Sequence, residues 1–343
     1  MLPVSRAMWR VEALTLFLIT AGVNANAQAN ASQRTGAAYS LSDGSVQIVA
    51  QHDLVPLIEQ LDASYAQSHR GVRFKVRGGD NYSAMAALSF DVSAFAPMTS
   101  EFTRIGLGDN LKISPEPTGF RIAHASLTPG TLVSPLAVIV NKANPLATLT
   151  MEQLTRAFVV GAPGNDVRRW SQLGIKGALA SRDIDPFGPP ADDSFPFDDP
   201  QVGEFLGTRK FNGLNFNHSY TQLAHYSDIV SRVAEDPAAI GITTLNTVTL
   251  GVKIIAIGSS RFSRAYTGTS EDIAAGRYPL DRYVYIYMRS NLGVELDPFA
   301  KEYIRFVLSP EGQRIIATSR AGYIPLNTRE VADELAKLSA LEH

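Results

Sequence analysis

The sequence lacks cysteine, a marked excess of either charge, and any apolar run long enough to span a membrane. The absence of cysteine from 343 residues excludes disulfides, thiolate metal sites, cysteine catalysis and a lipidated N-terminal cysteine. Lysine and arginine number 31 against 33 aspartates and glutamates, so no basic excess favours nucleic acid or an anionic membrane. We therefore expect no nucleic-acid partner and no lipid anchor.

The residues that are present are those of a packed protein. Hydrophobic residues make up 45% of the chain and charged residues 19%, which argues against a disordered or fibrous protein. A chain of 343 residues is also long enough for two packed domains.

The first thirty residues have the pattern of a secretory signal. Arg6 and Arg10 precede the apolar run 13–23, and the small-residue sequence Ala25-Asn26-Ala27 follows it. The apolar run is about half of the roughly 20 residues that a transmembrane helix needs. We expect residues 1–27 to be a cleaved signal peptide and the rest of the chain to be exported.

Strand and helix patterns then alternate along the chain. Residues 46–49 read as a strand, and apolar side chains at helical spacing from Leu54 to Tyr65 predict an amphipathic helix. A second strand at 72–76, a helix beginning near Ser83 and a third strand at 92–95 follow. This order predicts parallel strands with right-handed crossovers and helices on both faces of the sheet.

The same alternation restarts at residues 136–140, an apolar run suited to a strand buried on both faces. Thr150 and Gln153 form a capping box that predicts a helix after them, and Ser309 is placed to cap another. Residues 185–200 interrupt the pattern, because they hold five aspartates and five prolines. We interpret this segment as a long loop, and long loops inside compact domains are often functional.

Six stretches, in order, resemble the phosphate-type solute-binding proteins of ABC importers, which have the type II periplasmic binding protein fold. The resemblance covers about residues 45–326 and rests on Pro135 to Leu146, Leu149 to Leu154, Trp170 to Gly174, Asp236 to Ile242, Tyr278 to Tyr285, and Leu308 to Gln313 with Gly322 to Leu326.

The resemblance implies an α/β fold of two lobes, each a mostly parallel sheet flanked by helices, with the ligand in the cleft between them. The first lobe would be residues 38–132 plus 255–343, and the second would be 133–254. It further implies a periplasmic monomer that binds a small oxyanion, most simply phosphate, and presents it to an ABC transporter permease. No catalysis, cofactor or metal belongs to this interpretation.

The ligand loops of the family map onto four places in this chain. The candidate ligand-binding residues are Gln51, His52, Asp80, Asn81, Ser83, Thr99, Ser100, Asp193 and Ser194. Helix N-termini expose unpaired N–H groups and a positive dipole end, which suits an oxyanion.

The fourth loop departs from the family pattern. Pro189 stands where the family has an arginine, and Asp193-Ser194-Phe195 stands where it has Ser-Gly-Thr. An arginine–phosphate pair is worth roughly twice a neutral hydrogen bond. Aspartates beside a dianion would instead repel it by several kcal/mol, on the order of the Coulomb energy in a dry site. Either this acidic loop points away from the ligand, or the ligand is not phosphate.

Two alternatives therefore stay open. One is an exported binding or sensor protein of the same fold that takes a neutral or cationic ligand or has lost transport. The other is an exported hydrolase using His52 and Asp53 with Ser83 or Ser194, although no Gly-x-Ser-x-Gly motif accompanies them. A metal site from His52, Asp53, His69 or Asp192 and Asp193 would lack any recognised ligand spacing.

We predict that Ser83→Asp weakens phosphate binding by about tenfold or more, because it adds negative charge at the start of a helix that faces the ligand. The fold should be unaffected. Isothermal titration with phosphate measures the change, and an unchanged affinity would show that this helix does not face the ligand.

Overall fold

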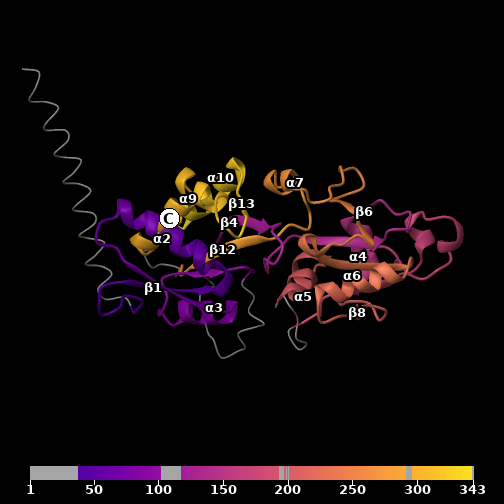
Figure 1. The fold of residues 1–343 in the computed structure, drawn as a ribbon, viewed down its shortest axis with the longest axis horizontal. Coiled ribbons are helices and arrows are strands. Elements are labelled where there is room, and N and C mark those ends of the chain that lie inside the picture. Colours follow the sequence, from indigo (N-terminus) through magenta and orange to yellow (C-terminus); the bar gives the residue numbers. More distant parts are fainter. Residues whose placement is uncertain are drawn as a thin grey trace, which may run out of the picture.

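The computed structural model describes residues 38–101, 117–192, 197, 199, 201–290 and 296–341. The predicted signal peptide lies outside these residues. Figure 1 shows two α/β lobes arranged along the long axis and joined at a narrow waist. Strands β1 to β4, β12 and β13 belong to the first lobe, which holds the N-terminal and C-terminal parts of the described chain, and strands β5 to β11 belong to the second.

The first lobe contains two sheets. Strands β1 (Val46–Gln51) and β2 (Phe74–Gly79) pair in parallel, and a four-stranded sheet has the order β13-β4-β12-β3. Its other strands are β3 (Ala96–Met98), β4 (Thr118–Ser126), β12 (Tyr283–Met288) and β13 (Tyr323–Pro325). Its helices are α2 (Val55–Ser68), α3 (Asn81–Ser89), α8 (Pro298–Val307), α9 (Pro310–Ala317) and α10 (Thr328–Ala340), with a short 3-10 turn η1 (His52–Leu54) before α2.

The apolar stripe predicted from Leu54 to Tyr65 accounts for the packing of α2. Leu57, Ile58, Leu61 and Tyr65 are its apolar buried residues, and they lie in the first-lobe core. The Tyr65 ring meets the ring of Tyr303 on α8 with a centroid distance of 5.2 Å. An aromatic contact of this kind adds to the stabilisation from burial alone, and it holds α2 against α8.

The second lobe is built on a five-stranded sheet in the order β10-β5-β9-β7-β8, with a separate pair β11-β6. Its strands are β5 (Leu136–Asn141), β6 (Thr148–Thr150), β7 (Asp185–Gly188), β8 (Thr221–Gln222), β9 (Ala239–Thr244), β10 (Val252–Ile254) and β11 (Ala256–Gly258). Its helices and turns are α4 (Met151–Phe158), η3 (Trp170–Leu173), η4 (Gly177–Leu179), α5 (Val202–Phe205), the π-helical η5 (Leu206–Lys210), α6 (Tyr226–Glu235), η6 (Leu245–Thr247) and α7 (Ser270–Ala274).

The local signals in this lobe are confirmed. All six residues of β5 are buried, as expected of a strand covered on both faces. Thr150 and Gln153 form the complete capping box at the start of α4. Trp170 is fully buried in the lobe core.

The strand pairing differs from the mostly parallel sheets that the resemblance implies. Strand β12 runs antiparallel to both β3 and β4, and β5 runs antiparallel to β9 and β10. Only β7 pairs in parallel with its neighbours within the large sheet. The reason for the β4–β12 pairing is topological: the chain leaves the first lobe after β4 and returns into β12, so these strands run in opposite directions.

Residues 185–188 correct the interpretation of 185–200 as a loop throughout. They form β7, between β9 and β8, even though Pro186 has no N–H to donate. The short β8 pairs only with Phe187 and Gly188, so no partner strand on that side requires an N–H from Pro186. The predicted strand at 92–95 is also displaced, since β3 begins at Ala96.

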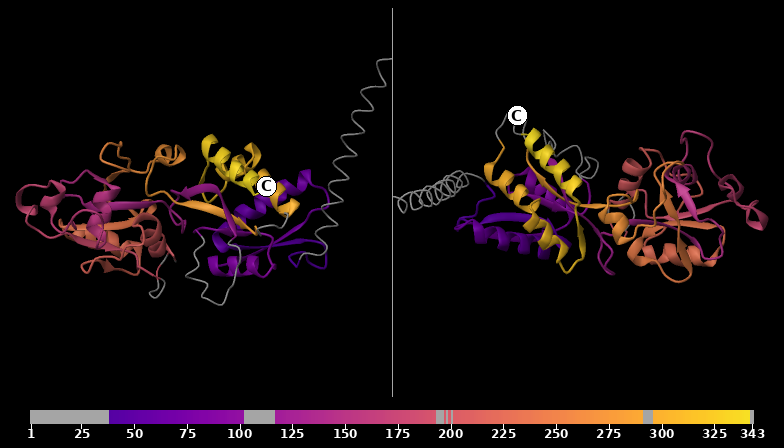
Figure 2. Two further views of the ribbon diagram at one scale, coloured as in Figure 1. Left: turned by 180° about the vertical axis from the view of Figure 1, so that it is seen from behind. Right: turned by 90° about the horizontal axis from the view of Figure 1, so that it is seen from above.

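The chain returns from the second lobe to the first at a later residue than 255, where the sequence predicts the boundary between the lobes. Ile255, Ile257, Ile273, Tyr278 and Leu280 pack in the core of the second lobe, and β11 pairs with β6. The chain joins the first-lobe sheet only at Tyr283, the first residue of β12. Figure 2 shows this orange segment against the second lobe from both directions.

A buried charge cluster fixes the segment in which the chain returns to the first lobe. His124 on β4 is fully buried, its Nδ1 lies 2.6 Å from Asp281 Oδ2, and its Nε2 lies 3.0 Å from Glu330 Oε2 on α10. Burial opposes charge on the imidazole, but the two carboxylates outweigh it and raise the pKa of His124 to about 9. His124 is therefore an imidazolium at neutral pH.

This cluster predicts a loss of stability at alkaline pH. Because the folded-state pKa of His124 exceeds its usual value of 6.5, its stabilisation is complete below pH 6.5 and disappears as the pH rises through about 9. The contribution is about 3 kcal/mol. Urea unfolding of the wild type and His124→Gln, measured between pH 6.5 and about 9, should show this loss. The difference in unfolding free energy between the two proteins should shrink as the pH rises.

His218→Gln is the control, because His218 is exposed on the second lobe. Its pH profile of unfolding should follow the wild type. Parallel profiles for His124→Gln and the wild type would contradict the assignment.

Candidate functional site

Three loops meet where strands of the first lobe end. Strand β1 ends at Gln51, β2 at Gly79 and β3 at Met98, and candidate residues follow each end. His52 Nδ1 lies 3.0 Å from the Gly79 carbonyl oxygen, which joins the first loop to the second. In open α/β folds, ligands bind at the carboxyl ends of strands.

Asp80 begins helix α3 as its N-cap. Its carboxylate accepts a 2.6 Å hydrogen bond from the backbone N–H of Ser83. The hydrogen bond to Ser83 lowers the pKa of Asp80 against a smaller effect of burial, so the carboxylate is ionised at neutral pH. Asp80 and Ser83 are both exposed. Their bonds to each other account for their positions without a ligand.

Asn81, Thr99 and Ser100 are buried, and Asn81 and Ser100 contact a glutamine of the second lobe. The Asn81 side chain accepts from the Thr99 N–H at 3.2 Å and donates to Gln201 Oε1 at 3.1 Å. The Ser100 hydroxyl donates to the same Gln201 oxygen at 2.5 Å. We call these four residues the bridging cluster. It is a polar contact between the two lobes.

Gln201 occupies an unusual backbone position. It precedes α5 with φ of 70°, in the left-handed region that residues other than glycine rarely adopt. Such strain costs on the order of 1 kcal/mol and persists where surrounding contacts hold it. The contacts from Asn81 and Ser100 are of that kind.

Charged residues surround the bridging cluster in internal pairs. Arg209 Nε lies 2.5 Å from Glu101 Oε2, and Tyr285 donates to the other oxygen of Glu101 at 2.9 Å. Arg282 is buried and holds both carboxylate oxygens of Asp199.

The Lys210 ammonium donates to the Pro279 carbonyl oxygen at 2.9 Å. Burial lowers the pKa of Lys210, and the nearby Asp281 and Glu101 oppose this. Arg209, Arg282 and Lys210 are thus each engaged by a group of the protein itself.

The structure brings together three of the nine candidates, Asn81, Thr99 and Ser100. Gln51 is buried, but its side chain accepts from the Asp53 N–H at 2.9 Å and caps the turn η1. His52 is exposed and pairs with a backbone carbonyl. Asp193 and Ser194 lie outside the described residues.

Sequence reasoning missed Gln201, Asp199 and Arg282. Gln201 is 120 residues from Asn81, and no periodicity or spacing marks it. Arg282 lies in one of the stretches that carry the family resemblance, but that stretch indicated only fold. Among the residues that the structure describes, no three histidine, aspartate or glutamate side chains are grouped so as to hold a metal ion. Within the same residues, no helix combines the length and the apolar character that a bilayer crossing requires.

Comparison with known proteins identifies a matching family and two relatives, one of which covers most of the chain. Residues 32–311 match the PBP superfamily domain. The chain is 24% identical over 302 residues to the phosphate-binding protein PstS of Pseudomonas aeruginosa, covering 86% of each chain. It is also 30% identical over 101 residues to phosphate-binding protein PstS 2 of Streptococcus agalactiae, covering 29% of this chain and 31% of that one.

Two solved structures share the fold at low sequence identity. PstS from Borrelia burgdorferi superposes with a TM-score of 0.54 at 15% identity, covering 83% of this chain and 99% of that one. An ABC-type phosphate transport receptor from Vibrio cholerae gives a TM-score of 0.52 at 21% identity, covering 82% and 99%. The two-lobed α/β fold expected from the sequence is confirmed.

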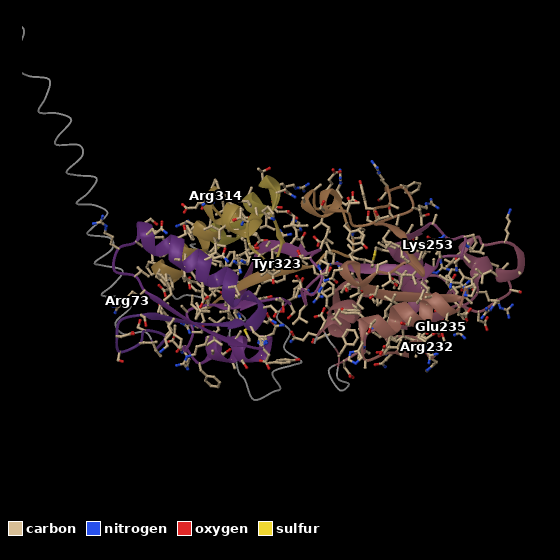
Figure 3. The ribbon with its side chains drawn as sticks, in the orientation of Figure 1. Arg73, Arg232, Glu235, Lys253, Arg314 and Tyr323 are labelled. Carbon is tan, nitrogen blue, oxygen red and sulfur yellow. The ribbon has the colours of Figure 1, made fainter. Side chains whose placement is uncertain are left out.

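The bridging cluster predicts that Gln201→Ala loosens the contact between the lobes. The change leaves the Asn81 amide and the Ser100 hydroxyl without their shared acceptor, at a cost of about 2 kcal/mol. Because the chain has no cysteine, nitroxide labels can be placed at single cysteines replacing Arg73 and Arg232, which lie in different lobes (Figure 3). The distance distribution between the labels should broaden and lengthen in the Gln201→Ala variant.

Gln222→Ala is the matched control. The side-chain oxygen of Gln222 also accepts a hydrogen bond, from the Ala191 N–H at 3.0 Å, but both residues belong to the second lobe. A Gln201→Ala distribution no different from that of Gln222→Ala would refute the role of Gln201.

Proposed function

Because the chain belongs to the PBP superfamily, we propose that it is an exported solute-binding protein that captures phosphate or a phosphate-like oxyanion for an ABC importer. Relatives named as phosphate-binding proteins support the ligand class, and the signal-like N-terminus supports export. The proposal includes a periplasmic monomer released by signal cleavage, without a lipid anchor. Its partner is the permease, which recognises the lobes closed on ligand.

The bridging cluster is the observation that carries this proposal. Thr99, Ser100 and Asn81 are neutral hydrogen-bonding residues at the carboxyl ends of strands, beside the N-terminus of α3. Hydroxyl and amide donors together with a helix N-terminus form the kind of site that holds an oxyanion. Ligand and Gln201 would then compete for, or share, the same donors, which links ligand binding to the contact between lobes.

The ionised carboxylate of Asp80 at the start of α3 bears on the choice of anion. It repels a fully deprotonated dianion, but it can accept the proton of monohydrogen phosphate. This favours phosphate over sulfate, which carries no proton at neutral pH.

One observation favours a second candidate, a binding protein of the same fold for a ligand that is not an anion. Arg209 and Arg282 are each engaged by a carboxylate, Glu101 and Asp199, so neither offers an unneutralised charge to an oxyanion. The hydrolase interpretation gains no such support, since the His52 ring pairs with the Gly79 carbonyl oxygen.

Isothermal titration with phosphate, sulfate, molybdate and a phosphonate tests the proposal. Thr99→Val and Ser100→Ala should each weaken phosphate binding by about tenfold, because each removes one hydroxyl hydrogen bond to a charged group. Both substitutions nearly preserve side-chain volume.

Ser231→Ala on α6 is the control, since its hydroxyl only donates to the Ser227 carbonyl oxygen within that helix. It should bind phosphate as the wild type does. If none of the four oxyanions binds the wild type, the anion proposal is wrong and the second candidate takes its place. If they bind but the Thr99 and Ser100 variants are unaffected, the site lies elsewhere.

A further inference from the structure

A row of basic side chains lies along strand β2 of the first lobe. Arg73 immediately precedes the strand, and Lys75 and Arg77 lie within it. Alternate residues of a strand point to the same face, and here the three basic residues are exposed, whereas Phe74 and Val76 between them pack against the first-lobe core. One face of β2 is therefore basic over about 13 Å of strand. We call Arg73, Lys75 and Arg77 the basic row.

The basic row leads toward the contact between the lobes. Figure 3 shows Arg73 at the end of the first lobe that is farther from the second lobe. The strand runs from there to Gly79, and two residues later the Asn81 side chain donates to Gln201 of the second lobe. Arg77, the last member of the row, is therefore the one nearest to the bridging cluster.

The row keeps most of its charge at the end nearer to the second lobe. Among the residues that the structure describes, neither Lys75 nor Arg77 forms an ion pair. At the other end, Arg73 donates to the backbone carbonyl oxygen of Asp43. Hydrogen bonds from Ser45, helped by the charges of Arg73 and Lys75, lower the pKa of the Asp43 carboxylate. That carboxylate therefore offsets part of the charge at the start of the row only.

The proposed oxyanion site gains little attraction from the charges beside it. Arg209 and Arg282 near the bridging cluster are each engaged by a carboxylate. The ionised carboxylate of Asp80, which begins the helix after β2, repels an approaching anion. Arg77, three residues before Asp80, opposes this repulsion at the end of the same strand. The basic row is thus placed to draw an anion past Asp80.

We propose that the basic row attracts phosphate from solution and guides it to the bridging cluster, which raises the association rate and leaves the dissociation rate almost unchanged. This inference rests on the proposed oxyanion function. A charge that does not touch the bound ligand acts mainly on association, and salt weakens its effect because exposed charges are screened over about 10 Å at 0.1 M. Phosphate held at the bridging cluster would contact hydroxyl and amide groups, and the row would act only on its approach.

Lys75→Gln combined with Arg77→Gln tests the proposal in stopped-flow measurements of phosphate binding. Because the chain has no cysteine, a fluorescent dye can be placed on a Thr208→Cys variant, in the wall of a cavity to which Tyr82 of the first lobe also contributes. At an ionic strength of about 20 mM, the association rate constant should fall about threefold or more, with the dissociation rate constant unchanged. In about 0.5 M sodium chloride, the association rates of the double variant and the wild type should agree.

Two control variants separate charge at this place from other effects. Lys142→Gln with Lys176→Gln removes the same net charge from exposed positions of the second lobe. Lys142 follows the far end of β5, since Leu136 at the start of that strand bonds to Leu280 in the return segment. Lys75→Arg with Arg77→Lys keeps the charge of the row and exchanges its side chains. Both control variants should bind phosphate at the wild-type association rate.

Three results would overturn the inference while phosphate still binds the wild type. They are an unchanged association rate in the Lys75→Gln, Arg77→Gln variant, a fall that the second-lobe variant shares, and a fall that persists in high salt. The basic residues would then serve only to discourage another chain from pairing with β2, which in the described part of the chain pairs with β1 alone. A wild type that does not bind phosphate would contradict the proposed oxyanion function together with this inference.

Discussion

The arrangement of the two lobes depends on buried charge at the place where the chain returns from the second lobe to the first. Asp281 and Arg282 are neighbours in sequence, and their side chains engage opposite lobes. Asp281 binds His124 on β4, whereas Arg282 binds Asp199 of the second lobe. Burying charges is costly, and removing one partner of such a pair typically costs about 3 to 5 kcal/mol. This penalty opposes any movement of either lobe away from the short backbone segment that carries Asp281 and Arg282.

That restraint decides the chemistry at the lobe contact. With the return segment held, the strand ends of the first lobe face α5, and Gln201 reaches Asn81 and Ser100. The charges around this contact are balanced by pairs such as Arg209 with Glu101. An oxyanion here would be held by hydroxyl and amide groups and a helix N-terminus, each weaker than a bidentate arginine but directional. Recognition would then depend on geometry more than on net charge.

Local features of the chain were predictable because their physics is local. The α2 stripe, the capping box at Thr150 and Gln153, and the cap at Ser309 each involve residues within about three helical turns of one another. Where the prediction was wrong, a distant segment decided the outcome. Pro186 is accepted in β7 because β8 stops short of it, and residues 255–280 join the second lobe because Ile255 and Ile257 find their apolar partners there.

The sequence by itself determined the two-lobed α/β fold, the family and most of the regular elements, since periodic apolar patterns and ordered motifs are properties of neighbouring residues. It also directed attention to Asn81, Thr99 and Ser100. Only the tertiary structure decided that these three meet one another, and that Gln201, 120 residues beyond Asn81, completes the cluster. Residues so far apart in sequence come into contact only after the chain has crossed between the lobes and the buried charges hold the lobes in place. No pattern among neighbouring residues encodes a contact of that kind.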